Sequence, residues 1–426
     1  MAGNAESELR LGETLAEGKT KVIRAATDHP GQVYLVAKDA ITAHNGVRKG
    51  QMEGKGVIAS ATCAAVFRYL ETVGIRTAFV EQASDNALLC RGCDMVPIEW
   101  VTRRVATGSF LKRNPGVKEG YRFTPPKQEL FFKDDAQGDP QWSEEQVLAA
   151  EFTCAGVRIG PDELRLMHKT TLAVFTVLEK LWASLGVALI DMKIEFGVDK
   201  ESGDILVADV IDNDSWRLWP AGDKRLMKDK QTFRDAETVT PEVMLDLKKN
   251  YQWVADQLAS FNANRHHLAV IIMGSPSDAE HCAKIRRHLT DLGISTDVRV
   301  SSAHKTTEET LRIVAEYEGG PDPVVFIAVA GRSNGLGPVL SGNTAFPVIN
   351  CPPAPVVDAD VFSSLRTPSG LGCSTVLYPE AAALAAAAVF GMHDPTLWSR
   401  LAVRRLTSWC KLNAADVGQR TATGRL

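Results

Sequence analysis

A glycine and two lysines near the start of the chain, in the motif Glu17-Gly-Lys-Thr-Lys21, could bind a polyphosphate. Gly18 permits a close approach to the backbone. The motif is expected at a strand turn, and because Lys19 and Lys21 alternate, both side chains could point one way off a strand. The motif lacks the frame of a Walker A loop. A solvated pair of lysines therefore stays open as the alternative.

A second basic motif runs from Arg103 to Arg113 with the letters RRVATGSFLKR. It holds four cationic side chains, one glycine and two hydroxyls. An arginine such as Arg103 can bind phosphate or carboxylate through two parallel hydrogen bonds, while the hydroxyl of Ser109 fixes its orientation. A basic strand on the surface is the alternative.

Carboxylates alternate with apolar residues in the segment 191–197, with the letters DMKIEFG. Asp191, Lys193 and Glu195 share one face of such a strand, and Met, Ile and Phe share the other. The segment 209–217, DVIDNDSWR, adds further carboxylates, Asp209 first. Mg²⁺ at a nucleotide takes one or two carboxylates plus phosphate oxygens, which this cluster could supply. The alternative is a surface strand with a ladder of Lys and Glu.

Three loops in the second half carry small residues beside side chains suited to an anionic ligand. They are Gly274-Ser275-Pro-Ser-Asp278, Ser302-Ala-His304-Lys305 and Gly331-Arg-Ser333-Asn334. The first opens a helix, where hydroxyls and backbone N–H groups form an anion site. Asp278 also fits the role of a helix cap. A histidine at such a loop suits acid–base work near neutral pH, and a structural histidine is the alternative.

The composition is typical of a folded protein, and the length predicts two or three domains. The chain has 426 residues, of which 45% are hydrophobic and 23% charged, with a net charge of −4. This balance offers no general basic field for nucleic acid or an anionic membrane. The first residues lack the pattern of a signal peptide, and the eight cysteines are scattered, so we expect a cytosolic protein with reduced thiols. A metal site at Cys90-Arg-Gly-Cys93 is disfavoured, because zinc usually takes four ligands.

The elements that position these residues change character along the chain. Residues 1–261 mix strands (33–37 and 205–210) with helical patterns (166–185 and 241–261), which indicates an α+β domain. A polar linker, 262–267, follows. From residue 268 to 426, apolar strands at 268–273, 298–300, 324–330 and 347–350 alternate with helices at 279–292 and 306–318. That rhythm predicts an α/β domain with a parallel sheet covered on both faces, whose ligands bind at the carboxyl ends of the strands.

The motifs of the first domain resemble those of a known family. The segments 95–109 (MVPIEWVTRRVATGS) and 189–197 (LIDMKIEFG) look like the two signatures of the SAICAR synthetases, and the segment 17–21 matches as well. These enzymes of purine biosynthesis join L-aspartate to carboxyaminoimidazole ribonucleotide (CAIR) at the expense of ATP. The resemblance covers about residues 8–260. One departure is His44, where the family usually has glycine.

The resemblance implies a role for each matching residue. ATP phosphates would be held by Gly18, Lys19 and Lys21. Mg²⁺ would be organised by Glu195 and Asp209, with Lys193 beside them as a catalytic residue. The ribonucleotide's phosphate and carboxylate would be held by Arg103, Ser109 and Arg217, and further contacts to aspartate or phosphate by Lys230 and Arg234. Cations and a metal suit a reaction in which a carboxylate becomes an acyl phosphate.

The loops of the second domain resemble the animal-type (class II) aminoimidazole ribonucleotide (AIR) carboxylases over roughly residues 267–410. The matching letters are GSPSD, SAHK and AGRSNGLGP. In animals this domain is fused behind the synthetase domain, so the whole chain resembles those bifunctional enzymes. Bacterial relatives that isomerise an N-carboxylated substrate usually have Arg after the histidine, whereas Lys305 and Ser333 point to direct use of CO₂. Thr306-Thr307 replaces the usual Gly-Pro, and the segment 354–361 is slightly short.

This second resemblance implies a site without biotin, metal or ATP. His304 would be the acid–base at the imidazole carbon, and Lys305 and Ser333 would hold CO₂ or the new carboxylate. The ribonucleotide would be bound by Ser275, Asp278, Ser302, Gly331 and Asn334. The expected fold is therefore an α+β ATP-binding synthetase domain followed by a three-layer, flavodoxin-like α/β carboxylase domain. The family also implies a homo-octamer built through the carboxylase domains.

Two other hypotheses stay open at this point. In the first, only one half is active and the other is an assembly or nucleotide-binding module, which separate assays of the halves would reveal. In the second, the chain binds purine-like nucleotides without turnover, against which the intact Glu195, Asp209, His304 and Lys305 argue. A generic kinase is disfavoured because the H-R-D and D-F-G motifs are missing.

Overall fold

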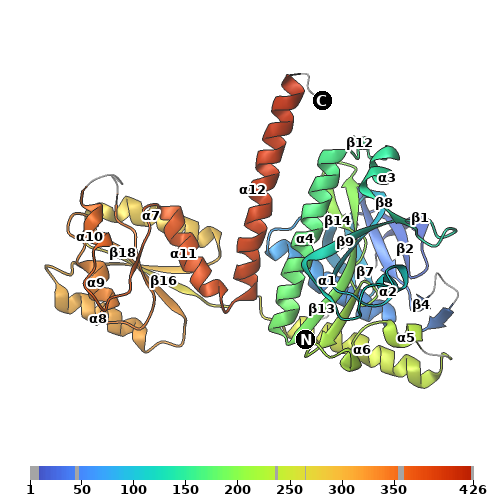
Figure 1. Cartoon of the computed structure of the whole chain (residues 1–426), viewed down its shortest axis with the longest axis horizontal. Coiled ribbons are helices and arrows are strands. Elements are labelled where there is room, and N and C mark those ends of the chain that lie inside the picture. Colours follow the sequence, from blue (N-terminus) through green and yellow to red (C-terminus); the bar gives the residue numbers. More distant parts are fainter. Residues whose placement is uncertain (1–8, 44–47, 236–237, 264, 354–358, 424–426) are drawn as a thin grey trace. The chain divides into compact units, whose positions relative to one another are not determined.

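The computed structural model describes the chain except residues 1–8, 44–47, 236–237, 264, 354–358 and 424–426 (Figure 1). His44 and most of the short segment 354–361 therefore lie outside the described residues. The chain divides into two compact units, Met1–Phe261 with Ala402–Leu426 and Asn262–Leu401. Among the described residues, no helix is both long and apolar enough to cross a membrane.

The first unit is built on two antiparallel sheets. The described strands of the smaller sheet are, in spatial order, β1 (Leu11–Glu17), β2 (Lys21–Ala26), β3 (Gln32–Ala37), β7 (Ala87–Arg91) and β6 (Phe79–Ser84). Those of the larger sheet are β10 (Gln141–Trp142), β9 (Arg122–Phe132), β8 (Cys93–Val105), β13 (Val187–Asp199) and β14 (Ile205–Ala208), with β15 (Trp216–Pro220) also paired to β13. Two short hairpins are β4 (Ala40–Ala43) with β5 (Arg48–Gln51), and β11 (Thr153–Cys154) with β12 (Val157–Arg158).

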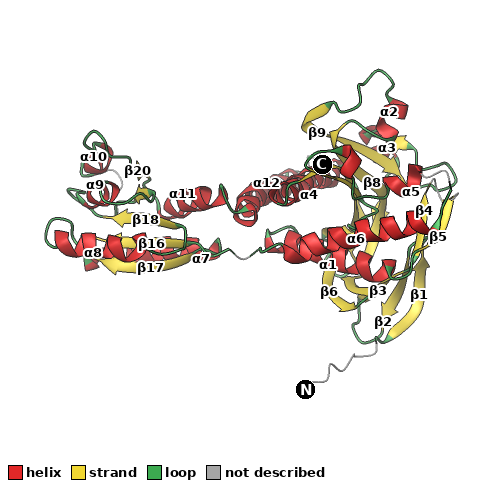
Figure 2. Cartoon of the chain, turned by 90° about the horizontal axis from the view of Figure 1, so that it is seen from below, coloured by secondary structure: helices red, strands yellow, loops and turns green. Residues whose placement is uncertain are grey.

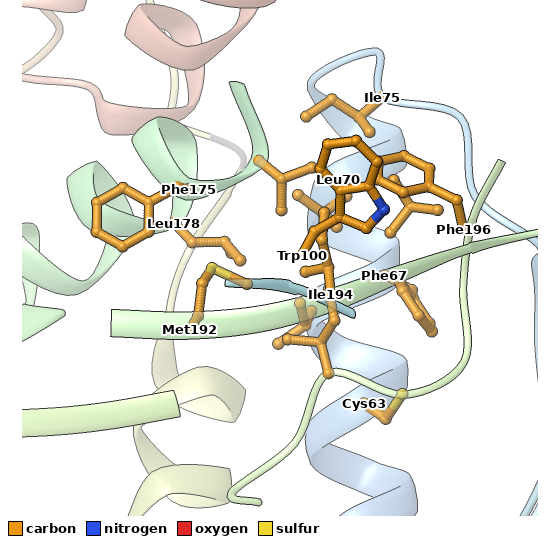
Figure 3. Packing of buried hydrophobic residues seen from close by; sticks show 14 of the residues in the cluster. Cys63, Phe67, Leu70, Ile75, Trp100, Phe175, Leu178, Met192, Ile194 and Phe196 are labelled. Atoms are coloured by element: carbon orange, nitrogen blue, oxygen red, sulfur yellow. The ribbon is translucent and has the colours of Figure 1, made fainter. Parts of the chain in front are cut away.

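Helices cover these sheets and supply much of the core. They are α1 (Lys55–Thr72), α2 (Ser109–Arg113), α3 (Glu144–Ala149), α4 (Pro161–Ser184), α5 (Gln231–Asp235), α6 (Pro241–Ser260) and the short 3₁₀ turn η1 (Lys224–Leu226). Figure 3 shows Phe67 and Leu70 of α1, Phe175 and Leu178 of α4, and Ile194 of β13 in one cluster. The apolar face predicted for β13 is therefore buried, which turns its polar face toward the opposite side.

The helix starts follow from capping chemistry. Thr240 accepts a hydrogen bond from the N–H of Val243, and Pro241 occupies the first turn of α6. The long helix predicted at 166–185 begins earlier, at Pro161. The predicted strand 205–210 is shorter, because Asp209 has a φ of 60° and cannot continue a strand.

The second unit has a parallel sheet, as predicted. Its described strands are, in spatial order, β17 (Ser295–Val300), β16 (Leu268–Met273), β18 (Val324–Val329), β19 (Val348–Asn350) and β20 (Ser374–Thr375). Figure 2 shows β16, β17 and β18 side by side. Met273 is in register with both Val300 and Val329, so these strands end at one edge.

Helices cover both faces of this sheet and make it a three-layer unit. The helices are α7 (Ala279–Asp291), α8 (Thr307–Glu318), α9 (Leu336–Ser341), α10 (Val361–Leu365), α11 (Pro379–Gly391) and the first part of α12 (Pro395–Ala422). Ile285 of α7 packs with the alanines of α11 in one core cluster, whereas Ile313 of α8 and Leu340 of α9 pack in another. The α/β prediction is confirmed.

The end of the chain differs from the domain boundaries we expected. Residues 402–426, which we assigned to the second domain, are grouped with the first unit. Val403 is 2% exposed and belongs to the core cluster of that unit. Arg420 forms an ion pair with Asp162 at 2.9 Å. This segment of α12 carries an apolar contact and a charge pair that periodicity alone does not reveal.

Candidate functional site

A cavity of about 610 Å³ in the first unit collects much of the predicted chemistry. The predicted residues in its lining are Lys19, Arg103, Ser109, Lys193, Arg217 and Arg234. Its walls come mainly from β8, β13 and β15, together with α2 and α5. Lys112 and Arg113 also line it, so the cavity is rich in cations and suited to an anionic ligand.

Strand pairing brings two predicted arginines to one carboxylate. Asp191 on β13 lies opposite Arg103 of β8 on one side and Arg217 of β15 on the other. Its Oδ2 accepts hydrogen bonds from Arg103 Nη1 at 2.7 Å and Arg217 Nη1 at 2.6 Å. Arg103 also donates to Glu129 on β9, at 2.5 Å. Arg103 is buried and held on two sides, which fixes its guanidinium rigidly in the cavity wall.

Gly108 is required where the backbone passes Arg217. Its φ is 59°, in the left-handed region, and a Cβ there would lie 2.6 Å from Arg217 Nη2. Ser109 begins α2 directly after this glycine and is exposed to the cavity. The Thr-Gly-Ser letters of the basic motif thus form a close turn around the guanidinium.

The predicted metal ligands, Glu195 and Asp209, both lie beside the ammonium group of Lys193. Lys193 Nζ contacts Glu195 Oε1 at 2.5 Å, Glu99 Oε1 at 3.0 Å and Asp209 Oδ2 at 3.9 Å. Glu195 Oε2 also accepts from Lys133 Nζ at 2.6 Å. Burial alone would raise the pKa of Glu195, but the ammonium groups of Lys193, Lys133 and Lys21 lower it to about 2. The carboxylate is therefore ionised at any physiological pH.

The first motif forms a turn between two strands, as we expected, and its two lysines bind different partners. Lys19 lies in the turn between β1 and β2, where the N–H of Gly18 donates to the carbonyl of Lys21. Lys19 pairs with exposed Asp135 at 2.8 Å, whereas Lys21 pairs with Asp209. Burial lowers the pKa of Lys21 to about 8. The turn separates the pair because β1 ends at Glu17 and β2 begins at Lys21.

A buried charge network that sequence reasoning did not identify surrounds Asp214 in the cavity wall. Its Oδ2 contacts Lys55 Nζ at 3.2 Å and Lys230 Nζ at 3.3 Å, and its Oδ1 accepts from the Tyr251 hydroxyl at 2.6 Å. Burial opposes ionisation, yet Lys55, Lys230 and Tyr251 lower the pKa of Asp214 well below its usual range. Lys230, predicted as a substrate contact, is occupied by this network, and Arg234 lines the cavity.

Two residues at the end of β9, Glu129 within it and Lys133 directly after it, were not predicted. Glu129 contacts Arg103, and Lys133 contacts Glu195. The alternation in KQELFFK at 127–133 was a usable signal. Recognising it requires the pairing of β9 with β8, which places Glu129 opposite Val101.

In the second unit, the three predicted loops follow β16, β17 and β18 at the common edge of the sheet. Ser275 caps the short 3₁₀ turn η2 (Pro276–Asp278) by accepting from the N–H of Ser277. Asp278 occupies the N-cap position of α7, but its side chain forms no capping hydrogen bond. Its carboxylate is half-buried and is not consumed by the cap that we considered as the alternative.

His304 and Gly335 bring the second and third loops together. A Cβ on Gly335 would lie 2.5 Å from His304 Nε2, so the ring lies directly against this glycine. His304, Lys305 and Ser333 are exposed. Asn334 is buried and ties the third loop to α10 by donating to Ser364 Oγ at 2.9 Å. Ser333 and Asn334 therefore differ: one faces solvent and the other braces the loop.

Thr306 compensates for the missing Gly-Pro after Lys305. Its hydroxyl donates to the carbonyl of Ser302 and accepts from the N–H of Ser302, both at 3.1 Å. Thr307 donates to the carbonyl of Ala303 at 2.5 Å. The hydroxyls thus close the Ser302–Thr306 loop and leave His304 and Lys305 exposed.

The chain is similar to known proteins along nearly its whole length. Residues 14–250 match the family model for SAICAR synthetase, and residues 268–408 match that for AIR carboxylase. A bifunctional phosphoribosylaminoimidazole carboxylase/phosphoribosylaminoimidazole succinocarboxamide synthetase of Rattus norvegicus is 54% identical over 411 residues, 96% of this chain and 97% of the relative. A protein of the same description from Drosophila melanogaster is 55% identical over 96% of this chain and 95% of its own length. A solved SAICAR synthetase (Type-2) in complex with ADP aligns with a TM-score of 0.52 at 32% identity, over 59% of this chain and 99% of its own.

Proposed function

Because the chain belongs to the bifunctional AIR carboxylase/SAICAR synthetase family, we propose a division of its chemistry between the two units. The protein is an enzyme of de novo purine biosynthesis that carboxylates AIR and synthesises SAICAR. It is thus both a lyase and an ATP-binding ligase. The second unit would carry out the carboxylation and the first unit the ligation.

In the carboxylase site, AIR would take up CO₂ directly. A C–C bond forms between the imidazole carbon and CO₂, and the proton leaving that carbon passes to His304. Lys305 and Ser333, both exposed beside His304, would hold the new carboxylate. The ribonucleotide would be bound by Ser275, Asp278, Ser302, Gly331 and Asn334. The imidazole is electron-rich at this carbon, so the step needs no biotin and no ATP.

In the synthetase site, CAIR would be bound by the cationic cavity. Arg103, Ser109 and Arg217 would hold its phosphate and carboxylate, with Lys230 and Arg234 nearby. Gly18, Lys19 and Lys21 would hold the phosphates of ATP. The CAIR carboxylate attacks the γ-phosphorus, ADP leaves, and the resulting acyl phosphate is displaced by the amine of L-aspartate to give the amide and phosphate. Lys193 would balance the charge that develops on the transferred group.

The residues present fit Mg²⁺ at this site. Glu195 and Asp209 converge on the same ammonium of Lys193. Within the described residues, no group of three or more His, Cys, Asp or Glu side chains could hold a metal alone. Mg²⁺ at a nucleotide needs only one or two carboxylates, because phosphates and water complete its shell. When bound, the ion would neutralise charge on the phosphates.

A homo-octamer assembled through the carboxylase unit and a cytoplasmic location complete the proposal. Large apolar side chains on the second unit favour assembly: Val300, Phe362, Leu365, Tyr378 and Met392 are each more than half exposed. Light scattering on the full chain measures the assembly directly. A monomer at working concentration would contradict the octamer and leave the catalytic assignments standing.

The observation that supports the two-site proposal is that the polar groups gather at two places, the cation-lined cavity of the first unit and the three loops at one sheet edge of the second. The test supplies purified protein with AIR and bicarbonate without ATP, and follows CAIR. Aspartate and MgATP are then added and SAICAR is followed. Carboxylation before ATP and ligation after it is the expected result. If the protein ligated supplied CAIR to aspartate but did not carboxylate AIR, the second unit would be an assembly module.

A further inference from the structure

Asp139 stands apart among the carboxylates that line the synthetase cavity. Each of the other three contacts a cation: Asp191 contacts two arginines, Glu99 contacts Lys193, and Asp214 contacts two lysines. Among the described residues, no cation lies within ion-pair distance of Asp139, which is half-buried. Within the part of the chain that the structure describes, this cation-rich cavity thus leaves one carboxylate without a direct counter-ion.

A tight turn fixes the position of this carboxylate. The N–H of Asp139 donates to the carbonyl of Asp134 at 3.0 Å, and its Oδ1 accepts from the N–H of Asp134 at 3.0 Å. Its φ of 52° lies in the left-handed region, which aspartate tolerates better than most residues. Gly138, just before it, also has a positive φ and also lines the cavity. One oxygen closes the turn, and Oδ2 remains for other chemistry.

The charges around Asp139 favour its protonation. Burial raises its pKa, Glu99 of β8 and Asp135 of the same loop raise it further, and the N–H of Asp134 and Lys19 of the β1–β2 turn offset this only in part. A carboxylate whose pKa is raised accepts a proton more readily than one that is ion-paired. Asp191, Glu99 and Asp214 already have their carboxylate oxygens in contact with cations.

We propose that Asp139 is the general base of the ligation step, accepting the proton that the nitrogen of L-aspartate must lose as it forms the amide. This inference rests on the acyl phosphate of the proposed function. The nitrogen forms a bond to the acyl carbon, the bond from that carbon to the phosphate oxygen breaks, and phosphate leaves. The proton released from nitrogen goes to Asp139 and from there to water. No oxidant or further reactant is needed.

The test compares two nucleophiles in the full-length Asp139→Asn protein. Asparagine keeps an oxygen that can close the turn and removes only the basic charge. Hydroxylamine is neutral under the assay conditions and needs no base to attack an acyl phosphate. We expect aspartate ligation to fall by about 100-fold or more, while the rate of hydroxamate formation from CAIR and MgATP stays near that of the parent. Carboxylation of AIR should be unchanged.

Asp94→Asn is the matched control. Asp94 also accepts one backbone N–H, from Ala155 at 2.8 Å, but it does not line the cavity. The control should lose neither reaction. The acid limb of the pH profile for aspartate ligation should disappear in Asp139→Asn and persist in Asp94→Asn.

Two outcomes would overturn the assignment. Equal losses with aspartate and hydroxylamine would place Asp139 in substrate binding or activation, and undiminished ligation would exclude it as the base. If the parent itself gave no hydroxamate, the acyl phosphate would be wrong. The role of Asp139 would then be judged from the pH profile. If Asp139→Asn kept the acid limb, Asp139 would not be the general base, and if it lost the acid limb, the assignment would be supported.

Discussion

The two candidate sites hold their polar groups in different ways. In the first unit, the side chains project from paired strands, and buried ion pairs such as Arg103 with Asp191 fix them. In the second unit, His304 and Lys305 project from an exposed loop that is fixed by backbone and hydroxyl contacts. The synthetase site should therefore be sensitive to changes of charge, and the carboxylase site to changes of shape in its loops.

The largest effect is expected where charge pairing is densest. Glu195→Gln removes one counter-charge from Lys193 and from Lys133, and it removes a proposed Mg²⁺ ligand. Lys193 keeps Glu99 as a partner, so the main loss is electrostatic stabilisation of the transferred phosphoryl group, and ligation should fall by up to about 1,000-fold. Carboxylation should be unchanged. Steady-state rates of both reactions measure this, with exposed Glu201→Gln as the control; a variant that ligates at the parent's rate would refute the role of Glu195.

The next effect tests the carboxylase loop by its chemistry. His304→Asn removes the proposed acid–base group, and carboxylation should fall by about 100-fold or more. Ligation of supplied CAIR should be unchanged. His266→Asn, at an exposed histidine paired with Asp322, is the control. Retained carboxylation in His304→Asn would reassign the proton transfer to another group.

A smaller effect tests the same loop by its shape. In Gly335→Ala the new Cβ would approach His304 Nε2 to 2.5 Å and displace the ring. Misplacement of a catalytic group by about 1 Å can cost up to about 100-fold, so we expect a loss of roughly 10-fold or more in kcat for carboxylation. Gly319→Ala, where a Cβ meets nothing within 4 Å, should have no effect. Equal rates for the two variants would mean that the loop does not position His304.

The smallest effect concerns stability in the first unit. Tyr251→Phe removes the hydrogen bond to Asp214 and should lower the free energy of unfolding by about 1–3 kcal/mol. The fold lowers the pKa of Asp214. The contacts of the ionised carboxylate therefore stabilise the folded protein fully above the ordinary pKa of aspartate, near 3.9, and this stabilisation is lost as the pH falls below that value. The difference between variant and parent should therefore shrink below about pH 4.

Thermal unfolding, followed through the loss of ligation activity, measures this change. Tyr34→Phe is the control, because Tyr34 also donates to an aspartate, Asp28, but lies outside the cavity lining. Tyr34→Phe should leave the ligation activity unchanged. If Tyr251→Phe unfolded at the same temperature as the parent at neutral pH, the Asp214 network would not brace the unit.

Much of the second unit could be predicted from the sequence, for a physical reason. Parallel strands end at one edge, so the loops after residues 273, 300 and 329 had to meet there. In the first unit, the motif residues Asp191 and Arg103 were recognisable, but their contact depends on the register between β13 and β8. Glu129, Lys133 and Tyr251 were missed because their roles arise from pairing and packing between distant segments.

One local prediction held and one failed at points where the backbone turns. The motif Glu17–Lys21 was placed at a strand turn, and the chain does turn between Gly18 and Lys21. The strand predicted to Val210 ends before Asp209, whose positive φ redirects its carboxylate toward Lys21 and Lys193. Apolar periodicity does not indicate where a strand ends, and Asp209, a proposed metal ligand, stands at this strand end.

The most direct test of two separate sites is to measure both reactions on Arg217→Ala and Lys305→Ala, each in the full chain. Arg217 lines the synthetase cavity and Lys305 stands on the carboxylase loop. We predict that Arg217→Ala abolishes ligation of CAIR to aspartate and spares carboxylation of AIR, and that Lys305→Ala does the reverse. The loss of both reactions in either folded variant would contradict the assignment of one site to each unit.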